Sequence, residues 1–118
     1  MTSFLFVLSA ALLQDATPPP AVMPRPAAVS ASSGAFTLTA ATEIWTDHAT
    51  APIGRFLARA LAPATGFPLH VRNGGTPTGP RIQLRRDSTL VSLGPEGYRL
   101  EVSAERVLIS AAEPAGVF

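Results

Sequence analysis

Twelve prolines and nine glycines divide this chain of 118 residues into short pieces, and this division constrains its fold more than any other feature. The best helix among the pieces is Ala51–Leu61. Its apolar residues recur at i, i+3, i+4, i+7 and i+8 and therefore share one face (Ile53, Phe56, Leu57, Ala60 and Leu61). Thr50 is placed to cap the first turn, and Pro52 is tolerated within it. Pro63 is expected to end the helix, because proline cannot donate the next hydrogen bond.

Short alternating segments on both sides of this helix predict strands, since alternation is typical of a half-buried strand. Tyr98 shares a face with Leu100 and Val102 and is expected in the core, while Ile82 and Leu84 are expected to face inward. The order of elements predicts an α+β fold of two layers, a largely antiparallel sheet with the helix packed on one face. The expected strands are Phe36–Thr39, Glu43–Thr46, Pro68–Arg72, Arg81–Arg86, Tyr98–Val102 and a return strand starting at Val107 and Ile109.

The N-terminus resembles a secretory signal peptide. Phe4–Leu13 is an apolar run, too short for the roughly 20 residues that span a bilayer but suited to a signal core. Residues 1–16 are therefore predicted to be a signal peptide, residues 17–26 a Pro-rich lead-in and residues 27–118 the folded domain. Met1–Ser3 contains no Lys or Arg, which departs from the usual signal pattern and leaves an ordinary apolar strand or disordered tail as the alternative. The signal predicts a periplasmic or secreted protein.

Charge and cysteine content exclude several classes of function. The net charge is +1, and the nine basic residues are all Arg and are scattered. This pattern argues against a nucleic-acid partner. No Cys is present, which excludes disulfides and Cys-ligated metal. No membrane span is expected.

No catalytic, cofactor-binding or metal-binding residue is predicted. His48 and His70 are 22 positions apart without an HExxH frame, so surface or structural roles are favoured over zinc or general-base chemistry. Asn73–Gly75 opens a Pro-rich connection rather than a helix, which argues against a phosphate loop. Three serines lie outside any G-x-S-x-G elbow and are not candidate nucleophiles (Ser9, Ser30 and Ser92). Four glutamates fall in turns or on strand faces, which is typical of solvated charges (Glu96, Glu101, Glu105 and Glu113).

Two aromatic residues leave carbohydrate contact open as a minor alternative. Trp45 lies on the strand face opposite Ile44 and is expected either to be exposed or to meet a neighbouring domain, whereas Tyr98 is expected in the core. A platform of both rings would suit the apolar face of a sugar. Because pattern alone supports it, carbohydrate contact by this domain is not favoured.

The C-terminal third carries a family resemblance. GPEGYRLEVSAERVLISAAEPAGVF (Gly94–Phe118) contains a Gly-Tyr-Xaa-Leu strand, a hairpin and an Ala-Gly-Val-Phe helix start. With the segments before it, it resembles the small N-terminal domain of family 20 glycoside hydrolases, the β-N-acetylhexosaminidases. The resemblance covers most of the chain from Val22 onward. The weaker matching segments come in the family's order (VMPRPAAV, Val22–Val29; SGAFTLTAATEIW, Ser33–Trp45; the helix and ATGFPL, Ala64–Leu69; RIQLRR, Arg81–Arg86).

The resemblance implies a non-catalytic, zincin-like domain that precedes a catalytic (β/α)8 barrel, its expected partner. In the family the barrel carries neighbouring Asp and Glu residues, and no such pair occurs in this chain. The chain alone is therefore expected to be inactive and to end before a second helix and the barrel. The parent is expected to remove terminal N-acetylglucosamine or N-acetylgalactosamine from glycans or chitin fragments. The alternatives are an accessory domain of another barrel glycosidase, such as an α-glucuronidase, and a free-standing periplasmic binding module. Substrate, oligomeric state and cleavage site stay open.

Overall fold

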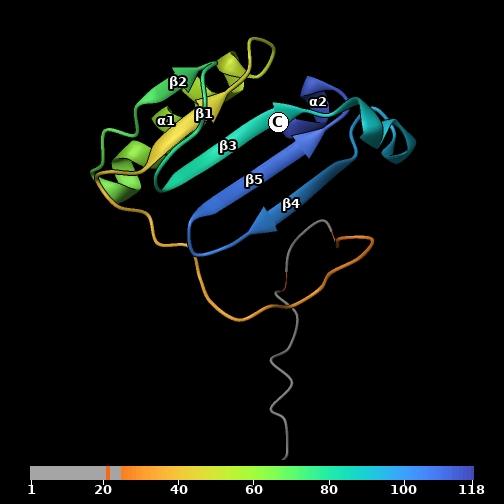
Figure 1. Cartoon of the computed structure of the whole chain (residues 1–118), viewed down its shortest axis with the longest axis horizontal. Coiled ribbons are helices and arrows are strands. Elements are labelled where there is room, and N and C mark those ends of the chain that lie inside the picture. The colour runs from red at the N-terminus through yellow and green to blue at the C-terminus, as the bar shows by residue number, and fades with distance from the viewer. Residues whose placement is uncertain (1–20, 22–24) are drawn as a thin grey trace, which may run out of the picture. The chain divides into compact units, whose positions relative to one another are not determined.

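A computed structural model of the chain describes Ala21 and residues 25–118 (Figure 1). The chain divides into two units, residues 1–33 and residues 34–118. The second unit holds every helix and strand that the structure describes. The predicted signal peptide lies outside the described residues, as does most of the predicted Pro-rich lead-in.

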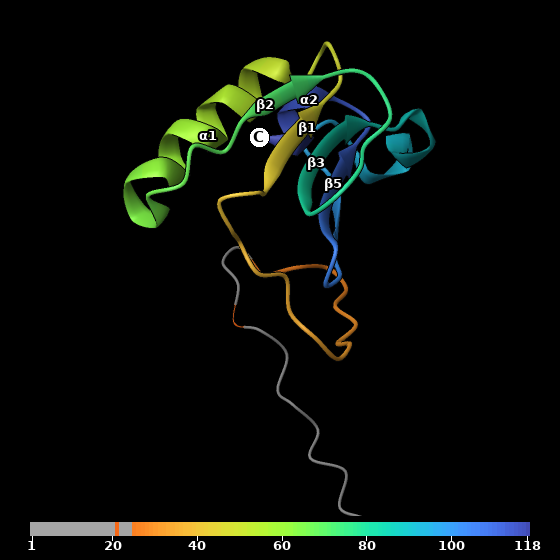
Figure 2. The same cartoon turned by 60° about the vertical axis from the view of Figure 1, so that its left-hand side comes forward.

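The second unit is a five-stranded sheet with helices on one side, in the strand order β2-β1-β3-β5-β4. Figure 2 shows the sheet nearly edge-on, with α1 and the C-terminus on the same side of it. A two-layer α+β fold is therefore confirmed. The elements in chain order are β1 (Glu43–Thr46), α1 (Ala51–Thr65), β2 (Val71–Asn73), β3 (Arg81–Arg86), the 3-10 helix η1 (Ser88–Leu93), β4 (Tyr98–Val102), β5 (Arg106–Ala111) and the short α2 (Pro114–Val117).

The sheet is mixed, and the prediction that it is largely antiparallel was wrong. β1 runs parallel to β2 and β3, and β3 runs parallel to β5; only β4 pairs antiparallel, with β5. The connections explain the difference. α1 carries the chain back between β1 and β2, and residues 74–80 carry it back between β2 and β3, so each strand starts at the same end of the sheet.

Two predicted strands differ from the structure. Phe36–Thr39 forms no strand, because Thr42 N–H donates to Thr39 O at 3.1 Å and closes a turn instead. Phe36 and Leu38 still pack against the core. The strand predicted at Pro68–Arg72 begins only at Val71, since Leu69 adopts a φ of 42°, which is not extended.

The helix also runs further than predicted. α1 continues through Pro63 to Thr65 and ends where Gly66, at a φ of 70°, donates its N–H to Ala62 O. Pro63 lies in the last turn, so it forgoes one main-chain bond near an end that is closed by the left-handed glycine cap. Pro52 sits in the first turn as expected.

The core lies between the helices and the sheet. Ile44, Ile82 and Leu84 point to this side, and the inward orientation predicted for the last two is confirmed. α1 reaches the sheet through Gly54. A Cβ atom at Gly54 would lie 2.5 Å from Cγ2 of Thr46, so the missing side chain lets the helix backbone approach β1 closely.

Candidate functional site

The helix side of the sheet is only partly covered. β4 pairs with β5 so that Leu100 lies beside Ile109 and Val102 beside Val107. These partners belong to the residues that pack against the core, so the apolar side chains of β4 lie on the helix side. They are nevertheless 47–52% exposed (Tyr98, Leu100 and Val102). The strand was predicted correctly, but the core position predicted for Tyr98 was wrong, because α1 packs over the opposite half of the sheet (Figure 2).

Two phenylalanines outside the sheet are exposed as well. Phe56 on α1 is 51% exposed and Phe118 is 77% exposed. Their ring centroids lie 5.3 Å apart with the planes tilted by 42°, a favourable aromatic arrangement. Phe56 belongs to the predicted apolar stripe of the helix, but α1 contacts the sheet around Gly54, which leaves Phe56 at the flank. We call these five residues the open apolar face (Phe56, Tyr98, Leu100, Val102 and Phe118).

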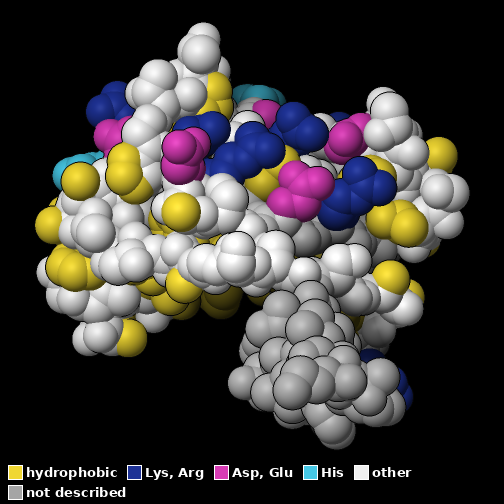
Figure 3. All heavy atoms as spheres, turned by 60° about the horizontal axis from the view of Figure 1, so that its bottom comes forward, with side chains coloured by type: hydrophobic (Ala, Val, Ile, Leu, Met, Phe, Trp, Pro, Cys, Tyr) yellow, Lys and Arg dark blue, Asp and Glu magenta, His cyan; other side chains and the backbone are white. Residues whose placement is uncertain are grey.

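The other side of the sheet carries Trp45 and most of the charged strand residues. Figure 3 shows basic and acidic side chains alternating in a band across the surface. Ion pairs on this side of the sheet include Arg72–Glu43 at 2.8 Å and Arg106–Glu101 at 3.8 Å. All four side chains are partly exposed to solvent, so each pair contributes little to stability.

Trp45 is buried on this side rather than presented to solvent. It is 8% exposed. The Arg72 guanidinium lies 5.8 Å from its ring centroid, and a Cβ at Gly75 would lie 3.5 Å from Trp45 Cζ3. The connection from β2 to β3 thus covers the indole, whose Nε1 has no hydrogen-bond partner among the described residues. Trp45 and Tyr98 lie on opposite sides of the sheet and form no shared sugar platform.

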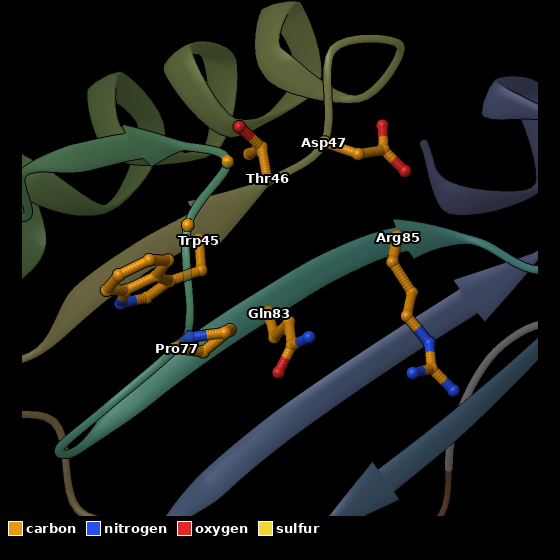
Figure 4. A pocket seen from close by; sticks show the side chains of 8 residues that line it. Trp45, Thr46, Asp47, Pro77, Gln83 and Arg85 are labelled. Carbon is orange, nitrogen blue, oxygen red and sulfur yellow. The ribbon is translucent and has the colours of Figure 1, made fainter.

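A shallow hollow of about 180 Å³ lies next to Trp45 (Figure 4). Pro77 closes it from the connection, while Gln83 and Arg85 project from β3 at its other side. The acidic group that lines it, Asp47, already accepts hydrogen bonds from Thr50 and Arg86. The hollow therefore combines a covered indole with few free polar groups, which is a poor basis for catalysis.

Asp47 links the start of α1 to the end of β3. Its Oδ1 accepts from Thr50 N–H at 2.8 Å and from the Thr50 hydroxyl at 3.0 Å, and its Oδ2 accepts from Arg86 N–H at 2.8 Å. Burial alone raises the pKa of Asp47, but hydrogen bonds from the Arg86 and Thr50 N–H groups outweigh burial and lower the pKa below its ordinary value. Thr50 makes no side-chain cap, contrary to prediction, because its hydroxyl contacts Asp47 and Leu84 O instead.

The other candidate residues stay apart. His48 and His70 are exposed, and no group of three or more His, Cys, Asp or Glu side chains gathers around a metal position within the described residues. Asn73–Gly75 leads from β2 into a connection and a strand, as predicted. Ser30 and Ser92 are exposed and Ser9 lies outside the described residues. The four glutamates are also exposed (Glu96, Glu101, Glu105 and Glu113).

Sequence reasoning missed η1 and the open apolar face. η1 had a local signal, because Asp87 accepts from the N–H and hydroxyl of Thr89 in the manner of a helix N-cap. The only sequence signal for the open apolar face was the alternation of β4, and alternation does not show whether another layer covers the strand. No described helix is long and apolar enough to cross a membrane.

Comparison with known proteins identifies the family. Residues 19–118 match the family described as glycosyl hydrolase family 20, domain 2. A β-N-acetylhexosaminidase of Cellulomonas fimi is 39% identical over 105 residues, which cover 85% of this chain and 21% of that protein.

Two solved structures resemble the fold. The family 20 β-N-acetylhexosaminidase of Streptomyces coelicolor A3(2) matches with a TM-score of 0.66 and 33% identity, over 78% of this chain and 18% of that chain. A mutant Streptomyces plicatus β-hexosaminidase in complex with its product GlcNAc matches with a TM-score of 0.71 and 35% identity, over 81% of this chain and 19% of that chain. This chain thus spans about a fifth of these relatives, and the match over residues 19–118 shows that it belongs to glycosyl hydrolase family 20, as a domain 2.

Proposed function

We propose that this chain is a non-catalytic accessory domain of a larger β-N-acetylhexosaminidase, and that its open apolar face packs against the catalytic (β/α)8 barrel of the same parent. The exposed side chains of that face carry the proposal. Large apolar side chains that stay exposed on one side of a soluble domain are typical of an interaction site. The relatives supply the partner, because they are hexosaminidases of which this chain spans only about a fifth.

Burial of this face would stabilise both parts of the parent. Each large apolar side chain removed from water contributes about 1.5–3 kcal/mol. Phe118 and Phe56 already contact each other, while the apolar row on β4 lies on the same side of the sheet. A surface that presses on this side would cover the aromatic pair and the β4 row together.

The parent's chemistry would reside outside this chain. We propose that the parent removes terminal N-acetylglucosamine or N-acetylgalactosamine by the substrate-assisted route, in which the acetamido group of the substrate replaces a protein nucleophile. Its acidic residues would come from the barrel, since this chain has no neighbouring Asp and Glu. The purified chain should release no nitrophenol from nitrophenyl N-acetylglucosaminide, and release at enzymatic rates would refute the non-catalytic role.

We further propose export from the cytoplasm, to the periplasm or the medium. The support is the apolar run Phe4–Leu13 and the break that follows it. N-terminal sequencing of the protein recovered outside the cytoplasm should give a start near Thr17. A start at Met1 would refute cleavage of a signal peptide.

Different observations argue against each of the two alternatives that the sequence left open. The α-glucuronidase accessory domain is disfavoured, because the relatives described above are β-N-acetylhexosaminidases. A free-standing binding module requires a ligand surface, and Trp45, the best aromatic candidate on the charged side, is covered. A free-standing module would also leave the open apolar face without a partner.

A chimera tests the docking. The segment of the Cellulomonas fimi enzyme that aligns with this chain is replaced by residues 19–118, and activity is measured on nitrophenyl N-acetylglucosaminide. The chimera should fold and hydrolyse the substrate. Leu100→Glu should lower the yield of active enzyme severalfold, because it places a charge in the proposed interface.

The matched control is Gln83→Glu, which adds the same charge to the other side of the sheet, where Gln83 is partly exposed. It should leave the chimera's yield and activity near those of the unmodified chimera. Equal behaviour of the two variants would place the barrel elsewhere and overturn the proposed docking face.

A further inference from the structure

β4 forms an outer edge of the sheet, and all five of its residues are exposed (Figure 1). Among the elements that the structure describes, only β5 pairs with it. A strand edge of this kind presents a row of N–H and C=O groups to which another strand can bond. The residues of β4 determine which strand fits.

The hairpin of β4 and β5 determines which amides face outward. Ser103 N–H donates to Arg106 O at 2.8 Å. In an antiparallel pair, bonded and non-bonded positions alternate, so Glu101 and Arg99, two and four residues before Ser103, also bond toward β5. The main-chain groups of the other three residues therefore point to the free edge (Tyr98, Leu100 and Val102).

We propose that two copies of this chain associate through β4, as antiparallel strands related by a two-fold axis at Leu100. Leu100 then faces Leu100 of the second copy, and Tyr98 faces Val102 of the second copy. These are the positions whose amides point outward, so the two edges can complete a continuous sheet. A two-fold contact uses the same patch on both copies, and β4 is complementary to itself.

Charge complementarity selects this register. Arg99 falls opposite Glu101 of the second copy, and the reverse pair forms at the same time. Both pairs occupy non-hydrogen-bonded positions, where side chains approach most closely, and opposite charges there favour pairing. A two-fold axis at Tyr98 would instead set Arg99 against Gly97, and an axis at Val102 would set Glu101 against Ser103.

The neighbouring side chains are compatible with this contact. Glu101 lies 3.8 Å from Arg106 of its own chain, and both side chains are at least 39% exposed, so Glu101 can contact a second guanidinium. The apolar side chains of both copies lie on the same side of the joined sheet. The association uses the strand edge and does not depend on the proposed docking of the barrel.

Charge reversal tests the register. The 118-residue chain is examined by sedimentation equilibrium over a range of concentrations, and a monomer–dimer equilibrium is expected. Arg99→Glu and Glu101→Arg should each raise the dimer dissociation constant about tenfold or more, because two attractive cross-strand pairs become repulsive. A mixture of the two variants should recover dimer, since each copy then presents charges opposite to its partner's.

Recovery on mixing also shows that both variants are folded. Arg59→Glu makes the same charge change at an exposed position of α1 and should leave the dissociation constant unchanged. The proposal is overturned if the unmodified chain stays monomeric throughout, or if the mixture associates no better than either variant alone.

A single cysteine tests the position of the axis, because the chain contains no other Cys. Leu100→Cys should form a disulfide-linked dimer under mild oxidation, since paired bonded positions have Cα atoms about 5.5 Å apart, within disulfide range. Val102→Cys is about equally exposed but faces Tyr98 of the second copy. Equal cross-linking of the two variants would overturn the register.

Discussion

The carboxylate of Asp47 accepts a hydrogen bond from the main-chain N–H of Arg86 at 2.8 Å, across 39 positions of sequence. The same carboxylate accepts from Thr50 at the start of α1. One side chain therefore ties the end of β3 to the first turn of the helix. Charge-assisted bonds to backbone donors are among the stronger polar contacts in proteins.

This relationship predicts acid sensitivity. The pKa of Asp47 is lowered in the folded chain, so the stabilisation it provides is fully present above the unfolded-state pKa of about 3.9 and is lost as the pH falls through the lower folded-state pKa. The free energy of unfolding, measured by urea titration at a series of pH values, should fall below about pH 4. Asp47→Asn should show a shallower fall.

A second carboxylate, Asp87, is expected to account for part of the pH dependence that remains in Asp47→Asn. Hydrogen bonds from the hydroxyl and N–H of Thr89 lower the pKa of Asp87 as well, so Asp47→Asn alone should keep part of the pH dependence. Adding Asp87→Asn should flatten the curve further, whereas Ser92→Ala, which removes no titratable group at an exposed position, should not. An unchanged slope in Asp47→Asn would show that the carboxylate gains nothing from the fold.

Gly54 should not tolerate even one methyl group. Alanine favours a helix by roughly 1 kcal/mol over glycine, but a Cβ here would meet Thr46 Cγ2 at 2.5 Å and two further side-chain methyls at 3.3 Å. Overpacking costs about 1–3 kcal/mol, so Gly54→Ala should lower the free energy of unfolding. Thermal or urea denaturation followed by far-UV circular dichroism measures the change.

A second variant isolates the clash. Thr46→Ser removes Cγ2 and keeps the hydroxyl, which donates to Arg72 O at 3.1 Å. In the double variant, the cost of Gly54→Ala should shrink by at least half. An equal cost with Ser and Thr at position 46 would mean that the helix shifts away from β1 without straining this contact.

Sequence patterns predicted the elements better than their arrangement. The strand Arg81–Arg86 and the hairpin of β4 and β5 follow from local alternation, and the structure confirms them. Parallel pairing of β1 with β2 and β3 depends on the paths that the connections take across the sheet. Local periodicity does not determine those paths, so it could not predict the parallel pairing.

The open apolar face could not be predicted from local patterns either. Alternation in β4 shows which side chains share a face, but not whether another layer covers that face. Tyr98 was expected in the core on this basis and is half exposed. Trp45 shows the converse, since a connection of glycines and prolines covers a side chain that the strand pattern alone left open.

The last prediction compares the covered and uncovered parts of the helix side. Leu84 is 1% exposed and Leu100 is 52% exposed, although both point to the same side of the sheet. Leu84→Ala should lower the free energy of unfolding by about 2–5 kcal/mol, and Leu100→Ala by under about 1 kcal/mol, at concentrations where the isolated chain is monomeric. In the chimera with the barrel, the cost of Leu100→Ala should rise toward that of a buried leucine, while the cost of Leu84→Ala should stay the same, because Leu84 is already out of contact with water. If the cost of Leu100→Ala is equally small in the isolated chain and in the chimera, the barrel does not cover β4, and the docking surface lies elsewhere on the domain.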